Sequence, residues 1–389
     1  MSDKIVTGIF NDSYAPITDG VAMVTKNYAY WLNRLVGPSC VITPDMPNYY
    51  DAEEFPVYRY LSLPITSRPP YRVGMNFAGE VTEKRRRGDG INERLHTNLM
   101  EMPFSLVHAH CPFTSGMLAQ NLAHIKKIPL VTTFHTKYKK DFEHSLKGNK
   151  ILVDVAMLYL KRFYESADYV WVPSADTIET MREYGIKGRI EVMPNGTDLN
   201  VSDEELEVLR GEGAKIFTPG SGAPLLLYLG QHIKEKNLDL LIEALAIAKR
   251  DGPDYRMVFI GDGYHRKDME ARVAELGLSD RVSFKGIIRD REVIKRAYAR
   301  ADILVFPSLY DTSSLIVKES AGMRLPSLLV QGSTTSEGVE DGHNGFLAEN
   351  SDEGYAKRLV AALEDGASRR KAGLGAYRTL YRSWENVIE

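Results

Sequence analysis

Short apolar runs alternate with amphipathic stretches along the whole sequence. In the first half the runs are KIVTGIF, SCVIT, SLVHAH, PLVTTFH and YVWVPS, and in the second half LLLYLG, MVFIG, VSFKG, ILVFPS and PSLLVQG. They are too short for helices and lack polar alternation, which is typical of parallel strands covered on both faces. Helical stretches such as NLDLLIEALAIAKR and HRKDMEARVAEL separate several of them. The pattern therefore predicts repeated β–α units and an α/β fold class.

A change of pattern divides the chain almost in half. Between about residues 195 and 224 the sequence passes through NGTDL, an acidic stretch of helical character (SDEELEVLRGEG) and the loop-forming residues TPGSGAP. A chain of 389 residues also exceeds what one hydrophobic core usually organises. We therefore expect two parallel-sheet domains with a cleft between them, and ligands beyond the carboxyl ends of the strands.

The composition is that of an ordinary soluble globular protein, with 43% hydrophobic and 26% charged residues and a net charge of -3. This balanced charge argues against nucleic acid as a partner. The two cysteines, Cys40 and Cys111, fit a reducing compartment better than a disulfide framework. The start MSDKIVTGIF lacks a signal-peptide layout, and no run approaches the roughly 20 apolar residues that span a bilayer. We expect a cytoplasmic protein, with peripheral attachment to the inner face of the cell membrane left open.

Basic residues gather in one part of the sequence. Residues 59–150 contain 15 Lys and Arg against 7 Asp and Glu, including RRR at 85–87 and KYKK at 137–140. One interpretation is scattered, solvated side chains; the other is a face that meets anionic lipid or a phosphate group. The stretch YLSLPITSRPPYRVGMNF is equally open, because it fits an interfacial segment or a proline-rich loop packed on the first domain.

Several loops after the predicted strands contain candidate phosphate-binding residues. Gly20 opens a helix whose free amides could receive a phosphate. Lys236 stands at the mouth of a helix and opposes its dipole, so an anionic partner would explain its place, although a solvated lysine is just as common there. Gly261 and Gly263 bracket Asp262 but lack the GxGxxG fingerprint of dinucleotide sites.

Three histidines, His108, His110 and His135, stand at strand ends, where a histidine is more often a hydrogen-bonding group than a catalyst. We expect no zinc site, because no ligands with converging spacing accompany them. The sequence contains neither a GxSxG elbow nor a P-loop.

The segment DTSSLIVKE places two carboxylates, Asp311 and Glu319, at either side of a predicted buried helix start. With the loops above, it completes a set of motifs that runs over nearly the whole chain: TDGV, VHAHCPF, TTFHTKY, ADYVWVPS, MPNGTD, LGQHIKEKN, FIGDG, VSFKGII, ADILVFPS and the closing YRSWENVIE. In order and spacing this set resembles the retaining glycosyltransferases of family 4. The resemblance implies the GT-B fold, in which two Rossmann-like parallel-sheet domains face a cleft.

The resemblance also implies a division of the chain. Residues 1–197 together with 376–389 would form the acceptor-binding domain, with a C-terminal helix that returns to it. Residues 198–375 would form the domain that binds the nucleotide-sugar donor.

The family's residue roles fall on particular positions of this sequence. Glu319 would accept hydrogen bonds from the ribose hydroxyls of the donor, and Asp311 from hydroxyls of the transferred sugar. Lys236 would neutralise the diphosphate as the sugar leaves, in place of a metal. Gly20 would let the first domain approach the diphosphate, and His135 would lie beside the donor sugar. The remaining donor-side positions are Gln231, Gly261, Asp262, Gly263, Ile288, Arg289, Ser313, Ser314 and Leu315, and the acceptor-side positions are His110, Lys137 and Tyr138.

Three positions depart from the family's pattern. Gln231 replaces a phosphate-binding arginine, so His232 or Lys234 would have to supply the missing charge. Asp311 is one methylene shorter than the usual glutamate, and Ser313 with Ser314 fills a place where glycine is common.

Within the family the first half looks most like bacterial diacylglycerol glucosyltransferases. This likeness implies UDP-glucose as the donor substrate, a membrane lipid such as 1,2-diacylglycerol as the acceptor, and no cofactor or metal. Two alternatives remain: the same transfer to a polysaccharide or lipid-linked glycan, and a non-catalytic subunit that binds a sugar nucleotide.

Overall fold

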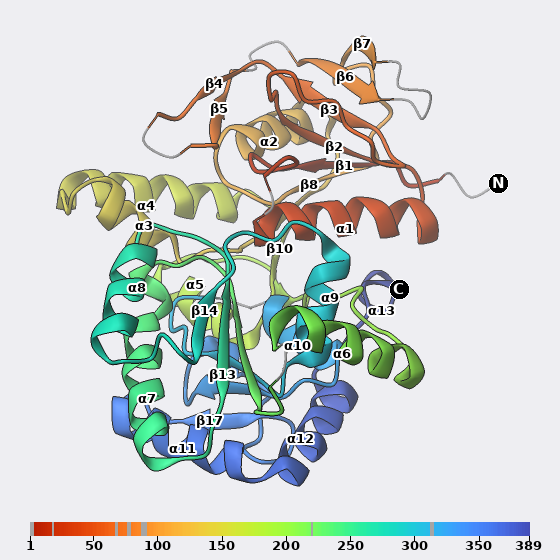
Figure 1. Ribbon diagram of the computed structural model, residues 1–389. Helices are drawn as coiled ribbons and strands as arrows, with labels where there is room; N and C mark the ends of the chain where they lie inside the picture. Colours follow the sequence, from red (N-terminus) through yellow and green to blue (C-terminus); the bar gives the residue numbers. More distant parts are fainter. Residues whose placement is uncertain are drawn as a thin grey trace. The chain divides into compact units, whose positions relative to one another are not determined.

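A computed structural model of the protein describes residues 4–17, 19–66, 69–75, 79–86, 92–218, 221–311 and 315–389 (Figure 1). The chain forms two compact units. Unit 1 comprises Met1–Asn195 and Trp384–Glu389, and unit 2 comprises Gly196–Ser383. Unit 2 has a parallel sheet and unit 1 a mostly parallel one, and each unit has its own cluster of buried apolar side chains.

Unit 1 is built on a nine-stranded sheet in the part of the chain that is described, with the order β11-β10-β9-β8-β1-β2-β3-β6-β7. Its strands are β1 (Thr7–Phe10), β2 (Ser39–Pro44), β3 (Val57–Tyr60), β6 (Glu80–Arg86), β7 (Asn92–Asn98), β8 (Leu106–Ala109), β9 (Leu130–Thr133), β10 (Tyr169–Val172) and β11 (Ile190–Val192). The small sheet of β4 (Ser62–Pro64) and β5 (Arg72–Gly74) is separate from it. The helices are α1 (Gly20–Leu35), α2 (Thr114–Lys126), α3 (Tyr138–Ser145), α4 (Lys150–Glu165), α5 (Ala175–Glu183) and α13 (Trp384–Ile388).

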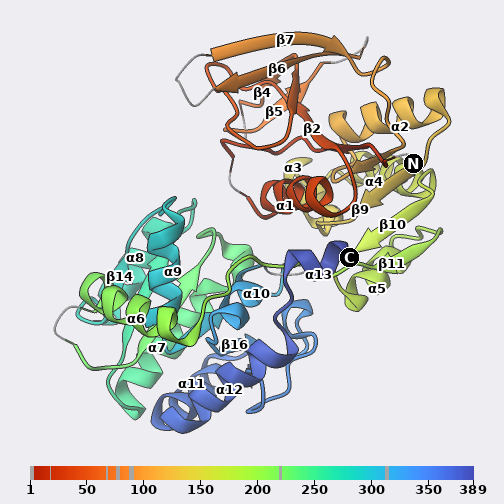
Figure 2. The same cartoon turned by 90° about the vertical axis from the view of Figure 1, so that its right-hand side faces the viewer.

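The central strands of unit 1 pair in parallel, whereas β6 and β7 form an antiparallel hairpin on the β3 edge (Figure 2). The predicted apolar runs became β1, β2, β8, β9 and β10, and β1, β2 and β9 are buried at every position. The β6–β7 hairpin carries charged residues and was not predicted, because its sequence shows no apolar run.

Unit 2 contains a six-stranded, wholly parallel sheet with the order β14-β13-β12-β15-β16-β17. Its strands are β12 (Leu225–Leu229), β13 (Arg256–Ile260), β14 (Val282–Phe284), β15 (Ile303–Phe306), β16 (Ser327–Val330) and β17 (Phe346–Ala348). The helices are α6 (Asp203–Phe217), α7 (Leu238–Asp251), α8 (Arg266–Glu275), α9 (Arg291–Arg300), α10 (Leu315–Gly322), α11 (Asp352–Glu364) and α12 (Gly366–Thr379), with short 3₁₀ turns η1 (Lys234–Lys236) and η2 (Thr334–Ser336).

Both sheets have the strand order of a doubly wound Rossmann fold around their first strand. In unit 2, β12 lies between β13 and β15, and in unit 1, β1 lies between β2 and β8. The order reverses beside these first strands, and the loops at the carboxyl ends of the strands there are where such sheets bind ligands.

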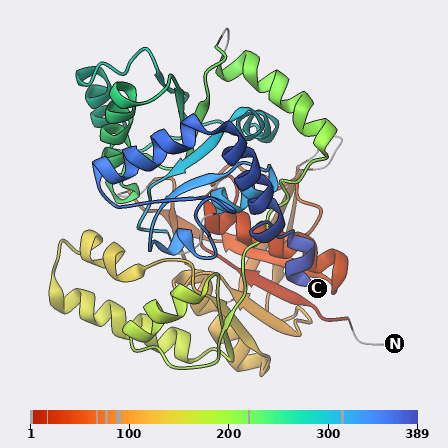
Figure 3. The same ribbon diagram turned by 90° about the horizontal axis from the view of Figure 1, so that it is seen from below.

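The C-terminal return is shorter than expected from the sequence. The predicted return began at residue 376, but α12 belongs to unit 2 and only residues from Trp384 onward join unit 1, where α13 packs beside α1 (Figure 3). Close backbone packing holds α12: a Cβ atom on Gly373 would lie 2.0 Å from the Arg324 carbonyl oxygen, and one on Gly375 would lie 2.1 Å from that of His343. The boundary at the centre lies between residues 195 and 196, two residues before the predicted one.

Candidate active site

The loops after β12 and β15 bring Lys236 and Asp311 together in unit 2. Lys236 Nζ lies 2.5 Å from Asp311 Oδ1, and the other carboxylate oxygen of Asp311 accepts a hydrogen bond of 2.5 Å from Ser308 Oγ. The ammonium group also lies 5.8 Å from the ring centroid of Phe306 and 5.6 Å from that of Tyr310. Lys236 is 9% exposed, so its charge needs this pairing. The sequence did not indicate that these two residues meet.

Glu319 occupies a second charged network in unit 2. Its Oε1 accepts a hydrogen bond of 2.6 Å from Arg291 Nη2, and its Oε2 accepts one of 2.7 Å from the Tyr298 hydroxyl. Burial and the adjacent Glu319 carboxylate raise the pKa of Tyr298, which therefore stays a hydrogen-bond donor. Each carboxylate oxygen retains a further lone pair for a ligand hydroxyl.

Arg291 and Tyr298 were not predicted from the sequence, although the position of Arg291 at the start of a helix could have indicated it. It is the first residue of α9 and opposes the helix dipole there, as Lys236 does near α7. The preceding loop contains Ile288 and Arg289, which were predicted to lie on the nucleotide side. In the structure Ile288 is half-buried against the core of unit 2, whereas Arg289 is exposed. Leu315 begins α10 and is half-buried, and Ser313 and Ser314 lie outside the described residues.

The glycines after β12 and β13 allow two loops to pack backbone against backbone. A Cβ atom on Gly261 would lie 1.9 Å from the Gly230 carbonyl oxygen, and one on Gly263 would lie 2.3 Å from that of His232. Asp262 is exposed and its Oδ1 accepts from the Gly263 amide at 2.9 Å. Packing therefore explains both glycines, and their contact with a nucleotide stays a prediction.

The side chain of Gln231 is exposed, but the neighbouring His232 is fully buried. Neither ring nitrogen of His232 has a hydrogen-bond partner among the described residues. Burial, reinforced by Arg266, lowers the pKa of His232 to about 4. His232 is therefore neutral near pH 7. The prediction that it could supply the charge of the missing arginine is wrong. Lys234 is exposed, so it remains the candidate for that charge.

In unit 1 the strand-end histidines form a contiguous group. His110 Nδ1 lies 2.9 Å from His135 Nε2, and His108 Nε2 lies 2.7 Å from Thr133 Oγ1. Burial lowers the pKa of all three imidazoles, to about 3 for His108 and His135, so they are neutral near pH 7. His110 is completely buried, whereas His135 is partly exposed. The buried His110 therefore holds the ring of His135 through this hydrogen bond, and its own side chain is not exposed to an acceptor.

Two further predicted residues have structural partners. Tyr138 is 6% exposed and its ring packs against Phe134 and Phe142, so it belongs to the core of unit 1 rather than to an acceptor-contacting surface. Lys137 immediately precedes α3 and is half-buried.

At the start of α1, next to Gly20, the Asp19 carboxylate already accepts hydrogen bonds from the Ala22 amide at 2.8 Å and from the Tyr71 hydroxyl at 3.0 Å. One of the amides expected for a phosphate is therefore occupied.

Comparison with known families identifies the chain. The model described as Glycosyltransferase Family 4 matches residues 18–201, and the model described as Glycosyl transferases group 1 matches residues 214–379. The chain belongs to the family 4 glycosyltransferases. The predictions of this family, of the GT-B fold and of a hexosyltransferase are confirmed by these matches and by the proteins described next.

Two similar sequences are named alpha-monoglucosyldiacylglycerol synthase. The one from Streptococcus pneumoniae is 24% identical over 329 residues, or 82% of this chain and 69% of that protein. The one from Acholeplasma laidlawii is 24% identical over 371 residues, or 91% of this chain and 87% of that protein. Among solved structures, Anabaena HepE in complex with UDP and glucose has the same fold, with a TM-score of 0.69, 17% identity and coverage of 99% of this chain and 97% of that one.

Two features are absent from the described part of the chain. No group of three or more His, Cys, Asp or Glu side chains there could hold a metal ion. No helix there is long and apolar enough to cross a bilayer.

Proposed function

We propose that this family 4 glycosyltransferase transfers glucose, with retention of configuration, from UDP-glucose to a membrane lipid such as 1,2-diacylglycerol. The observation that carries the donor half is the partly buried ion pair of Lys236 and Asp311 at the switch point of unit 2. The acceptor half rests on the two alpha-monoglucosyldiacylglycerol synthases, whose similarity extends over most of the chain.

The proposed chemistry assigns a separate task to each charged group. Lys236 would turn from Asp311 to the diphosphate and stabilise the negative charge that develops as the sugar leaves. Asp311 would then accept hydrogen bonds from hydroxyls of the transferred glucose. Glu319, held by Arg291 and Tyr298, would accept from the ribose hydroxyls through its remaining lone pairs.

Radiolabelled UDP-glucose tests the proposal directly. The purified protein is incubated with diacylglycerol in detergent micelles and, separately, with glycan acceptors, and the products are separated and counted. We expect label in a glucosyl-diacylglycerol with the α configuration. Lys236→Ala, which removes the cation of the ion pair, is the matched inactive control.

Other outcomes would revise particular parts of the proposal. Label in a glycan product alone would show that the acceptor is a polysaccharide or lipid-linked glycan. Binding of UDP-glucose without transfer to any acceptor and without release of UDP would instead indicate a non-catalytic subunit.

A further inference from the structure

The turn η1, which carries Lys236, has few hydrogen bonds of its own. The Lys236 amide donates to the Ile233 carbonyl at 3.1 Å, and the Asn237 amide donates to the Lys234 carbonyl at 2.9 Å. Hydrogen bonds of 3₁₀ turns have poorer geometry than those of α-helices. In the proposed reaction Lys236 also leaves Asp311 for the diphosphate, so the backbone of η1 needs support that does not depend on this ion pair.

One such support comes from the loop after β13. The Tyr264 hydroxyl accepts a hydrogen bond of 3.2 Å from the Lys234 amide and donates one of 2.5 Å to Glu235 Oε2. A phenol hydroxyl can accept and donate at the same time, and a bond to a carboxylate is stronger than one between neutral groups. A single atom of the β13 loop thus holds two consecutive residues of η1.

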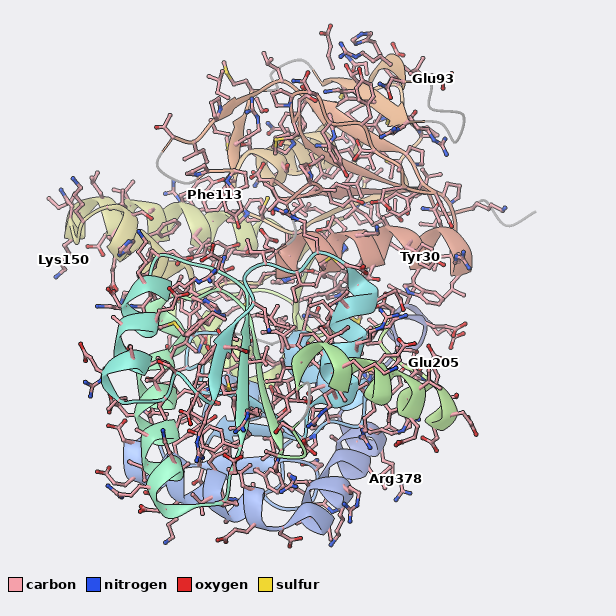
Figure 4. The ribbon with its side chains drawn as sticks, viewed as in Figure 1. Tyr30, Glu93, Phe113, Lys150, Glu205 and Arg378 are labelled. Atoms are coloured by element: carbon pink, nitrogen blue, oxygen red, sulfur yellow. The ribbon has the colours of Figure 1, made fainter. Side chains whose placement is uncertain are left out.

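The side chain of Tyr264 is 64% exposed, so packing in the core does not explain its place. Its backbone, however, is anchored on both sides. The His232 amide donates to the Asp262 carbonyl and the His265 amide donates to the His232 carbonyl, both at 3.0 Å. The His265 ring lies 2.6 Å from Asp239 Oδ1 of α7, and α7 and α8 are neighbours at the left of unit 2 (Figure 4). Tyr264 therefore has a fixed base from which to hold η1.

A second support is Asn237, the residue that follows Lys236. Its backbone is in the left-handed region, with a φ of 58°. Glycine adopts this conformation without strain, so the conformation alone does not require an amide side chain. The Asn237 amide donates hydrogen bonds to the Pro307 carbonyl at 3.3 Å and to Asn350 Oδ1 at 3.0 Å. Asn237 thus fastens the end of η1 to the loops after β15 and β17.

The loop after β15 also holds the partner of Lys236. Ser308, the residue after Pro307, donates its hydroxyl to Asp311 Oδ2. The Asn237 side chain therefore attaches the backbone beside Lys236 to the same short segment that orients Asp311. Both members of the ion pair are held relative to one loop.

We propose that Asn237 and Tyr264 are positioning residues for the transferase reaction, a role that rests on the proposed function of Lys236 at the diphosphate. They hold η1 in place while the Lys236 side chain turns from Asp311 to the leaving group. Neither residue contacts the substrate in this proposal; both act through Lys236. The competing explanation is that the two side chains only stabilise the fold of unit 2.

Binding of UDP to the full-length protein tests the proposal, because UDP carries the charge that develops on the leaving group. Tyr264→Phe removes the hydroxyl and keeps the ring, and Asn237→Gly removes the amide and keeps the backbone conformation. We expect the Kd for UDP, measured by calorimetry, to rise about three- to tenfold in each variant. Uridine has no phosphate, so its Kd, measured by competition with UDP, should stay unchanged and show that the site is folded.

Two control variants make the same chemical changes away from η1. Tyr377→Phe removes a hydroxyl from α12, whose Arg378 is labelled at the right of unit 2 in Figure 4. Asn48→Gly makes the same substitution at another left-handed position, with a φ of 61°, on the surface of unit 1. Both variants should bind UDP like the wild type.

A double-mutant cycle separates positioning from general stabilisation. If the two residues act through Lys236, Tyr264→Phe and Asn237→Gly should not weaken UDP binding further in a Lys236→Ala protein. If they weakened it there as much as in the wild type, or if neither changed UDP affinity in the wild type, the proposal would be wrong.

The same measurements separate this proposal from the proposed function. If Lys236→Ala left UDP affinity unchanged, the role of Lys236 at the diphosphate would be refuted, and the positioning role with it. If the cycle showed the expected coupling but no label reached diacylglycerol, the proposed acceptor would be refuted and the positioning role supported.

Discussion

In unit 2 the loops at the switch point carry paired charges, whereas in unit 1 the corresponding strand ends carry neutral imidazoles. Lys236 and Asp311 form an ion pair, but His108, His110 and His135 all have lowered pKa values. The two sheets share the same strand order around β12 and β1, so topology does not explain the difference. Burial acts on what the sequence places there: an ion pair keeps its charge when its partner is adjacent, and a buried imidazole beside other imidazoles loses its proton.

The contrast is chemically useful for a glycosyltransferase. A diphosphate leaving group develops negative charge, which a fixed ammonium group stabilises. Neutral imidazoles cannot stabilise that charge as cations, but they can donate and accept hydrogen bonds with hydroxyl groups. Four predictions test this division, from the largest expected effect to the smallest.

Lys236→Ala should have the largest effect. Removing one group aimed at developing charge typically lowers turnover about 100- to 1000-fold, and we expect a fall of that size in kcat/KM with UDP-glucose. Lys215→Ala is the matched control, because Lys215 is an exposed lysine of α6 and has no part in the candidate site. Equal effects of the two substitutions in steady-state kinetics would contradict a special role for the buried lysine.

Glu319→Ala should weaken UDP binding more than Asp311→Ala does. Loss of a charged hydrogen-bonding partner costs about 1.5–3 kcal/mol, so we expect the Kd for UDP to rise roughly 10- to 100-fold, as measured by calorimetry. Asp311→Ala should mainly lower kcat, because contacts to the departing sugar strengthen in the transition state. Tyr298→Phe removes only one donor to Glu319 and should have a smaller effect on Kd. If both carboxylate substitutions changed UDP affinity equally, this division of roles would be wrong.

The free energy of unfolding of unit 1 should decrease as the pH is lowered, because His108 is neutral in the folded unit. In the unfolded chain His108 takes up a proton below its usual pKa of about 6.5, but in the folded unit only near pH 3. Its stabilising effect is therefore complete above about pH 6.5 and decreases by about 1.4 kcal/mol per pH unit toward about pH 3. In the wild type, the free energy of unfolding measured with urea should be about 2 kcal/mol lower at pH 5 than at pH 6.5 because of His108.

His108→Gln should remove that part of the pH dependence, whatever it does to stability at neutral pH. His124→Gln, at an exposed position of α2, is the matched control and should leave the slope unchanged. An unchanged slope in His108→Gln would mean that the imidazole is not held neutral.

Removal of divalent metal ions should have the smallest effect of the four, because we expect it to leave the transferase activity unchanged. Because Lys236 is proposed to take the electrostatic role of a metal, activity should be the same with and without EDTA. Loss of activity in EDTA, restored by magnesium or manganese, would overturn this expectation. A magnesium titration of the untreated enzyme in the same assay gives the comparison.

Local sequence determined much of the fold. The apolar runs became strands because most of their side chains are apolar and can be buried on both faces of a sheet. The division into two units followed from the loop-forming residues near 195–224, and Ser202 begins α6 by accepting a hydrogen bond from the Glu205 amide. The β6–β7 hairpin escaped prediction because edge strands need no apolar pattern.

The partners in the site were decided only by tertiary structure. Lys236 and Asp311 are 75 residues apart, and they meet because β12 and β15 are neighbours in the sheet, which local sequence does not specify. The same holds for Glu319 with Tyr298 and for the neutral state of His232. Each depends on which segments of the chain cover a side chain, because burial and proximity of partners, rather than residue type, set its charge and its exposure.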